Sequence, residues 1–441
     1  MNIFIIGQTS LHWGRMEFGN IGNFYVIDPF FKEIKRVFPN CKIKTTIQMS
    51  ERYCAENDIE VVPLDLYYSW DDKDFLNKCF AEYAVAILYK KTGSIQTKSP
   101  FINEVLWADL VIDMSGDVWG DNADFAGPNR FLVGLLKDRV AQLLDKPVVM
   151  LAGSPGPFAN HREIHKFTKE VFEGFDFVTN RENTSIEVLK QYGFDVKKVN
   201  SYACPAFLFE GVEDEEIELI INNENLFSKD HNLVGFILCG WNMAEGPYSK
   251  WPRKDEEYSN FVEIIEFMIN KLNLRIVLYS HNNGFEKFPV FKITPGRDYP
   301  VVKQLFEIVR KREKADPEKL TLINGVYSPR QMKTIIKQFD MQISGRVHGS
   351  VASLSQFIPT VMIDYGHEPK AHKVKGFARV VQIENYLADP SDINDLKEKI
   401  LLCWENRIEY RKHLIERIPV VKDLARKNFE ELRNYFNLLN N

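Results

Sequence analysis

Short apolar runs alternate with longer amphipathic runs along this chain, and the alternation occurs in two successive blocks. A buried parallel strand has the pattern of a short apolar run, and the helix that follows it has an amphipathic pattern. Two such blocks predict two α/β domains, each with a parallel sheet and helices on both faces. The apolar runs are residues 2–7, 42–47, 60–64, 109–115, 147–153 and 175–179, and then 233–240, 274–280, 320–325, 339–344 and 359–364.

An acidic stretch, residues 210–218, separates the two blocks. We predict an N-terminal domain over residues 1–205, a linker over 206–232 and a C-terminal domain over 233–390. Residues 391–441 carry apolar side chains at helical spacing, which predicts C-terminal helices that pack on the domains. A membrane-surface role for these helices is the alternative.

Composition excludes several classes of protein. The formal net charge of −5 argues against a general nucleic-acid binder. The six cysteines are scattered without a C-x-x-C pair, which favours reduced thiols over disulfides or a zinc site. The start, MNIFIIGQTS, has the pattern of a first strand, and no stretch approaches the ~20 apolar residues of a membrane span. We expect a cytoplasmic protein, with peripheral attachment at the inner face of the membrane as the alternative.

The stretch SGRVHGS, residues 344–350, lies where a strand is predicted to end and a helix to begin. Ligands of parallel sheets bind at the carboxyl ends of the strands. Arg346 supplies a two-pronged cation for a carboxylate or phosphate, and His348 supplies a group that exchanges protons near neutral pH. In an extended backbone residues i and i+2 point the same way, so both side chains are expected to face one ligand. The alternative is a surface arginine beside a histidine that caps the helix.

Four other segments precede this pair in a fixed order, and they follow predicted strands or contain tight turns. Arg181 follows a strand at the start of a helix that Asn183 or Thr184 is predicted to cap. The first segment is open to two interpretations, a turn that only starts a helix or a ligand contact. The segments are GNIGN (19–23), GDVWGDN (116–122), SPGPF (154–158) and RENTS (181–185).

This ordered set resembles the polysaccharide pyruvyl transferase family, from about residue 19 to about residue 377. The family's G-N-x-G-[ND], S-x-G-P-F, R-x-x-x-S and R-x-H motifs and its late lysine segment occur in that order. Here they are matched by Gly19–Asn23, Ser154–Phe158, Arg181–Ser185, Arg346–His348 and either Lys370 or Lys373.

The resemblance implies two Rossmann-like α/β domains with parallel sheets facing a cleft, as in the GT-B glycosyltransferases. It implies a transferase that moves the enolpyruvyl carbon of phosphoenolpyruvate onto two hydroxyls of a sugar in a cell-surface polysaccharide precursor. The products are a pyruvate ketal and phosphate. This chemistry requires no metal or cofactor. The expected partners are phosphoenolpyruvate, a sugar or lipid-linked oligosaccharide acceptor, and, as a further option, a second copy of the chain.

Each candidate residue therefore has an expected role. His348 is the expected acid/base, because its side chain can deliver and remove protons. His281 follows a strand of the second block, so it is expected to face the same ligand. The residues expected to bind the donor are Arg181, Arg346, His281, Ser344 and Lys373. The residues expected in acceptor or cleft loops are Asn20, Asn23, Asp117 and Ser154.

Two other functions remain as alternatives. A GT-B glycosyltransferase with a nucleotide-sugar donor would need an acidic residue for the ribose hydroxyls, for which Asp364 and Glu368 are candidates. A non-catalytic glycan-binding protein is disfavoured, because it has no need for Arg and His gathered at strand ends. HREIH (161–165) lacks the acid position of a metalloprotease helix, so a solvated helix face is expected there.

Overall fold

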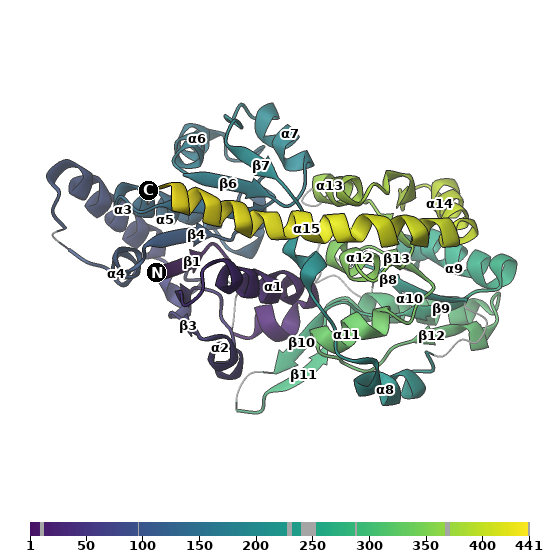
Figure 1. Cartoon of the computed structure of the whole chain (residues 1–441). Helices are drawn as coiled ribbons and strands as arrows, with labels where there is room; N and C mark the ends of the chain where they lie inside the picture. The colour runs from purple at the N-terminus through teal and green to yellow at the C-terminus, as the bar shows by residue number, and fades with distance from the viewer. Residues whose placement is uncertain are drawn as a thin grey trace. The chain divides into compact units, whose positions relative to one another are not determined.

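The computed structural model describes residues 1–8, 13–95, 97–226, 232–239, 253–286, 289–366 and 371–439 (Figure 1). Contacts between residues group the chain into two compact units. The first unit consists of Met1–Glu17, Phe30–Cys204 and Leu424–Asn441, and the second of Phe18–Pro29 and Pro205–Asp423. This grouping differs from the predicted domains in three places: residues 18–29 and the predicted linker, 206–232, join the second unit, and residues 424–441 join the first.

The first unit is built on a seven-stranded parallel sheet with the strand order β3-β2-β1-β4-β5-β6-β7. Its strands are β1 (Asn2–Ile6), β2 (Lys42–Thr45), β3 (Ile59–Val61), β4 (Leu110–Asp113), β5 (Val148–Gly153), β6 (Phe177–Asn180) and β7 (Val199–Ser201). Its helices are α2 (Glu51–Asn57), α3 (Phe75–Thr92), α4 (Pro100–Trp107), α5 (Arg130–Leu143), α6 (His165–Glu173) and α7 (Thr184–Gln191).

The second unit is built on a six-stranded parallel sheet with the order β12-β9-β8-β13-β14-β15, and a separate antiparallel pair, β10-β11. The strands are β8 (Leu233–Ile237), β9 (Arg275–Leu278), β10 (Asn283–Glu286), β11 (Lys292–Pro295), β12 (Leu320–Leu322), β13 (Met341–Ser344), β14 (Thr360–Ile363) and β15 (Leu387–Ala388). The helices are α8 (Glu218–Asn223), α9 (Ser259–Leu272), α10 (Tyr299–Arg312), α11 (Pro329–Ile336), α12 (Val347–Leu354), α13 (Ala371–Val381) and α14 (Ile393–Glu405).

Two helices, α1 (Ile21–Val37) and α15 (Arg407–Leu439), contain residues of both units. Figure 1 shows α15 as one long yellow helix that ends the chain. Helix α14 packs on α9, β14 and β15, as expected for a C-terminal helix with an apolar stripe. None of the described helices is both long and apolar enough to cross a membrane.

The two sheets share one strand order. When the strands of each sheet are numbered along the chain, they lie in the order 3-2-1-4-5-6, and the first sheet adds a seventh strand at the end. This is the doubly wound order, and its topological switch point lies between the first and fourth strands. The switch points here fall between β1 and β4 and between β8 and β13. The predicted fold class, two Rossmann-like α/β domains with parallel sheets and C-terminal helices, is confirmed.

Every predicted strand is present, although its ends differ from the prediction by a few residues. The sequence did not predict β7, β15 or the β10-β11 pair. These strands are two to four residues long. Their sequences, VNS, LA, NGFE and KITP, carry at most two apolar residues each and do not stand out as apolar runs, so neighbours in the sheet define them.

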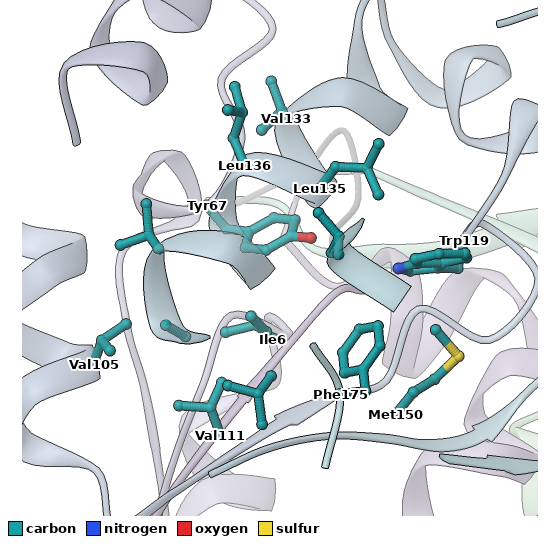
Figure 2. Close-up of a cluster of buried hydrophobic side chains, with 14 of the residues drawn as sticks. Ile6, Tyr67, Val105, Val111, Trp119, Val133, Leu135, Leu136, Met150 and Phe175 are labelled. Carbon is teal, nitrogen blue, oxygen red and sulfur yellow. The ribbon is translucent and has the colours of Figure 1, made fainter. Parts of the chain in front are cut away.

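The core of the first unit also fixes one of its edge loops (Figure 2). Trp119, in the loop after β4, is buried, and its ring centroid lies 5.8 Å from that of Phe131 and 6.0 Å from that of Phe175. Burial of an aromatic side chain of this size stabilises by roughly 1.5–3 kcal/mol. The tryptophan of the predicted GDVWGDN segment therefore anchors this loop in the core.

Candidate functional site

In the first unit, the loops after β4 and β5 are joined by backbone hydrogen bonds. The amide of Ser154 donates to the carbonyl of Gly116 at 2.7 Å, and the amide of Gly156 donates to the carbonyl of Trp119 at 2.9 Å. This pairing holds two of the predicted segments, GDVWGDN and SPGPF, against each other at the carboxyl edge of the sheet.

Arg181 follows β6 at the same edge and is almost fully buried, with 5% of its surface exposed. Its Nε donates to Ser154 Oγ at 2.9 Å, and its Nη2 lies 4.0 Å from Asp117 Oδ1. The structure thus brings together three of the residues predicted from sequence, Arg181, Ser154 and Asp117. Their predicted roles in binding stay predictions.

The start of α7, next to Arg181, is capped differently from the prediction. Asn183 occupies the cap position, but its side chain makes no cap hydrogen bond. The carboxylate of Glu182 accepts from the Ser185 amide at 3.0 Å and from the Ser185 hydroxyl. The predicted cap position is therefore correct for Asn183, but the amide of Ser185 in the first turn is bonded by the buried Glu182 instead of by the Asn183 side chain.

Beneath the first switch point lie two fully buried carboxyl groups, Asp113 at the end of β4 and Asp138 in α5. Burial raises the pKa of Asp113 to about 6. Burial also raises the pKa of Asp138 well above its ordinary value, and the negative charge of Asp113 raises it further. With both groups ionised, Asp138 Oδ1 has no hydrogen-bond partner among the described residues. A proton shared with Asp113 supplies that partner, and the raised pKa values of both carboxyls favour such sharing.

One arginine partly balances this acidic pair. Arg130, the first residue of α5, donates from Nη2 to the Gly7 carbonyl at 2.8 Å. Its guanidinium lies 4.8 Å from the ring centroid of Tyr67 and 5.0 Å from that of Tyr68. The arginine therefore ties the end of β1 to the acidic pair, and its cation also rests on two aromatic rings.

In the second unit, Arg346 lies directly after β13 and next to the second switch point. Its Nε and Nη2 donate to the two carboxylate oxygens of Asp298 at 2.8 and 2.5 Å. The Asp298 side chain is fully buried and that of Arg346 is 11% exposed. A bidentate pair of this kind fixes the plane of the guanidinium. Two of the five N–H donors of Arg346 are thus bonded to Asp298.

His348 is the second residue of α12, and not part of an extended segment. The expectation that Arg346 and His348 align as i and i+2 of a strand is therefore wrong, because only Arg346 has extended dihedrals, with φ −116° and ψ 121°. Instead the imidazole lies beside the first turn of α1 on one side. On another side its ring centroid is 6.1 Å from that of Phe377 in α13.

His281, after β9, is 2% exposed, and its Nε2 has no hydrogen-bond partner among the described residues. Burial lowers its pKa to about 3, with further lowering from the charges of Arg346 and Lys333. The ring of Tyr25, whose hydroxyl is likewise buried without a described partner, lies 5.3 Å from the imidazole. His281 is thus a neutral, buried imidazole in the second unit.

Lys333 in α11 is the fourth base of this region. It is 2% exposed, its Nζ lies 5.9 Å from the Tyr25 ring centroid, and it donates to Ser355 Oγ. Burial lowers its pKa to about 7. Neither Tyr25 nor Lys333 was predicted as a site residue, because both have the helical spacing of ordinary packing residues. A buried lysine leaves no local signal in sequence.

The remaining predicted residues have the following positions. Asn20 precedes α1, and its carbonyl accepts from the amide of Asn23 at 3.0 Å, so this segment starts a helix. Ser344 Oγ accepts from the Arg346 amide at 3.2 Å and donates to the Arg346 carbonyl at 2.8 Å. Lys373 lies in α13 with its side chain buried. Lys370 falls outside the described residues. Their contributions to binding stay predictions.

Comparison with known proteins agrees with the motifs. The family model described as polysaccharide pyruvyl transferase matches residues 50–367, more than half of the chain. The amylovoran biosynthesis protein AmsJ of Erwinia amylovora is 23% identical over 278 residues, which are 61% of this chain and 59% of that protein. The match therefore spans less than two thirds of this relative's length.

Solved structures share the fold at low sequence identity. A glycosyltransferase from Rickettsia africae superposes with a TM-score of 0.58 at 12% identity, over 100% of this chain and 99% of that one. Anabaena HepE in complex with UDP-glucose gives 0.56 at 11%, over 98% and 100%. The UDP-GlcNAc 2-epimerase of Methanocaldococcus jannaschii gives 0.53 at 13%, over 91% and 92%. These likenesses show a GT-B-like fold.

Proposed function

The chain belongs to the polysaccharide pyruvyl transferase family, and on that premise we propose that it transfers the enolpyruvyl group of phosphoenolpyruvate to a sugar. The carbon that carries the phosphate becomes bonded to two sugar hydroxyls, so that a cyclic pyruvate ketal forms and phosphate leaves. The acceptor is a sugar of an exopolysaccharide precursor, free or lipid-linked. The relative named for amylovoran biosynthesis supports an acceptor of this class.

The proton balance of this reaction requires an acid/base group at the donor. One proton must reach the methylene carbon of phosphoenolpyruvate, which becomes a methyl group. The two acceptor hydroxyls each lose a proton as their oxygens bond to the central carbon. One of these protons accounts for the proton that the methylene carbon gains, and the other is carried away by the released phosphate. We assign the transfers to His348, whose imidazole both accepts and donates protons near neutral pH.

Arg346 is proposed to hold an anionic end of the donor. The observation that carries the proposal is its bidentate pair with the buried Asp298, which fixes the guanidinium plane two residues before His348. Orientation by a buried carboxylate holds the guanidinium in a set plane, as anion recognition requires. In the first unit the Nε of Arg181 is fixed by Ser154, and the role of Arg181 in donor binding stays a prediction.

Buried bases around Arg346 support an anionic ligand in the second unit. Lys333 and His281 lie in a region where desolvation disfavours their cations. An incoming anion shifts such groups back toward protonation, because an opposite charge favours the charged form. A neutral ligand offers no comparable compensation.

A nucleotide-sugar donor is the competing assignment. This assignment needs an acidic residue in the second unit for the ribose hydroxyls, and Asp364 is the candidate that lies among the described residues. Asp364 Oδ1 accepts from the Gly366 amide at 3.0 Å, and its Oδ2 lies 3.8 Å from Lys375 Nζ. Both oxygens are thus engaged. The other candidate, Glu368, falls outside the described residues.

Phosphate release from phosphoenolpyruvate, measured against a panel of sugar acceptors, tests the proposal. We expect release that depends on the acceptor, and a product whose mass increases by that of a pyruvate ketal. The same panel with nucleotide-sugars in place of phosphoenolpyruvate is the control for the competing assignment. Sugar transfer from a nucleotide-sugar, with no phosphate release from phosphoenolpyruvate, would overturn the proposal. The predicted cytoplasmic location stays a prediction.

A further inference from the structure

Gly22, in the first turn of α1, lies against the imidazole of His348 within the second unit. A Cβ built at Gly22 would stand 2.8 Å from His348 Cβ and 3.1 Å from His348 Nδ1. Ordinary contact for such an atom begins at 3.4 Å. No other residue type fits at position 22 while the histidine keeps its place.

The backbone gives no other reason for a glycine at this position. Gly22 lies inside a helix and is absent from the residues with positive φ. Glycine in a helix is less favourable than alanine, because it loses more backbone freedom on folding. The space taken by the His348 ring is therefore the physical reason that the structure offers for this glycine.

The first two turns of α1 are held firmly on the second unit. The ring of Tyr25 stacks on that of Phe209 with a centroid distance of 4.5 Å. One turn later the buried Asp28 accepts from Arg330 Nη2 at 2.8 Å. Because these contacts fix α1, a methyl group at position 22 is expected to displace the whole side chain of His348, whose Cβ it meets first and whose imidazole it meets next.

We infer that Gly22 is a positioning residue for His348: the bare backbone of α1 sets where the imidazole lies, while Phe377 borders it on another side. The inference rests on the proposed role of His348 in proton transfer. It also gives the GNIGN segment a function of its own, distinct from ligand binding. The segment would position the imidazole of His348, which lies more than three hundred residues away in sequence.

The test compares Gly22→Ala with Gly134→Ala, a helical glycine of α5 whose Cβ would meet only the Tyr67 hydroxyl, at 3.2 Å. We expect Gly22→Ala to lower kcat about ten- to a hundredfold, because a displacement on the order of 1 Å costs about a hundredfold. The KM for phosphoenolpyruvate should change less than about threefold. Gly134→Ala should keep both constants near wild type.

A double-mutant cycle separates positioning from general damage. In a His348→Gly background, which also removes the Cβ nearest to position 22, Gly22→Ala should cause no further loss of kcat, because every atom of the side chain that it displaces is gone. A further loss of the same size in that background would overturn the inference. So would a Gly22→Ala variant with wild-type kcat.

A second measurement is independent of activity. The imidazole NMR signals of His348, assigned by their absence in His348→Ala, should shift in Gly22→Ala and stay in place in Gly134→Ala. If the wild type releases no phosphate from phosphoenolpyruvate, the proposed function fails, and these signals still decide whether Gly22 positions the histidine. Unshifted signals in Gly22→Ala would refute the positioning role even in an active enzyme.

Discussion

The two units share one strand order, yet the deeply buried groups whose pKa burial shifts most are carboxyls in the first unit and bases in the second. In the first unit the buried groups include two carboxyls, Asp113 and Asp138. In the second they include the bases His281 and Lys333, next to Arg346. In both units burial shifts the pKa values toward the neutral form. The topology therefore fixes where a ligand can bind, and the buried side chains fix which charge it can carry.

This difference assigns different tasks to the two units. Buried bases become charged when an anion arrives, so the second unit suits the phosphate and carboxylate of the proposed donor. A carboxyl pair that holds a proton is a poor partner for another anion. The acidic pair instead orders the loop after β4, through the Trp119 indole N–H that donates to Asp138 at 3.2 Å.

The largest effect is expected from His348→Ala. Turnover should fall by at least about a hundredfold, the lower end for a positioned acid/base, while affinity for phosphoenolpyruvate stays within a few-fold. The pH–rate profile should also lose one limb, since the titrating group is gone. Steady-state phosphate release over a pH series measures both. Near-normal turnover with an unchanged profile would make His348 a structural residue.

Lys333→Met should stabilise the protein, and more so at low pH. The folded pKa of Lys333, about 7, lies below its ordinary value of 10.5. Between these pH values the unfolded state binds more protons, so wild-type stability rises with pH as the burial penalty is relieved. The gain from Lys333→Met should be about 2–3 kcal/mol larger at pH 6 than at pH 9, since wild type loses the penalty over about two pKa units at about 1.4 kcal/mol each. Urea unfolding of both proteins measures it.

Asp138→Asn should show the opposite pH trend. Folded pKa values of the acidic pair are raised above the ordinary 3.8, that of Asp113 to about 6. The folded state then binds more protons between about pH 4 and 6, and wild-type stability falls as pH rises through this window. The gain from Asp138→Asn should therefore be larger at pH 7 than at pH 4. Equal gains at both pH values would contradict a buried, proton-sharing pair.

The elements of the fold were largely predictable, since strands and helices of ordinary length carry their own periodic pattern. The site was predictable only where its residues follow strands, as Arg181 and Arg346 do. Asp298, the partner of Arg346, is 48 residues away and carries no local signal. The same holds for Gly22 beside His348, because only the folded chain brings residues so distant in sequence together.

Calorimetric titration with phosphoenolpyruvate of wild type and Arg346→Lys tests the central claim, that the second unit binds the donor through an oriented arginine. A lysine keeps the charge but cannot serve Asp298 and an anion with one planar fork. We expect binding to weaken by about 1.5–3 kcal/mol, the range for hydrogen bonds to charged groups. The matched control is Arg310→Lys, because the guanidinium of Arg310 donates to the backbone of Pro317 at an exposed site. This variant should bind phosphoenolpyruvate as wild type does. Unchanged affinity in Arg346→Lys would contradict the account and remove Arg346 from the donor site.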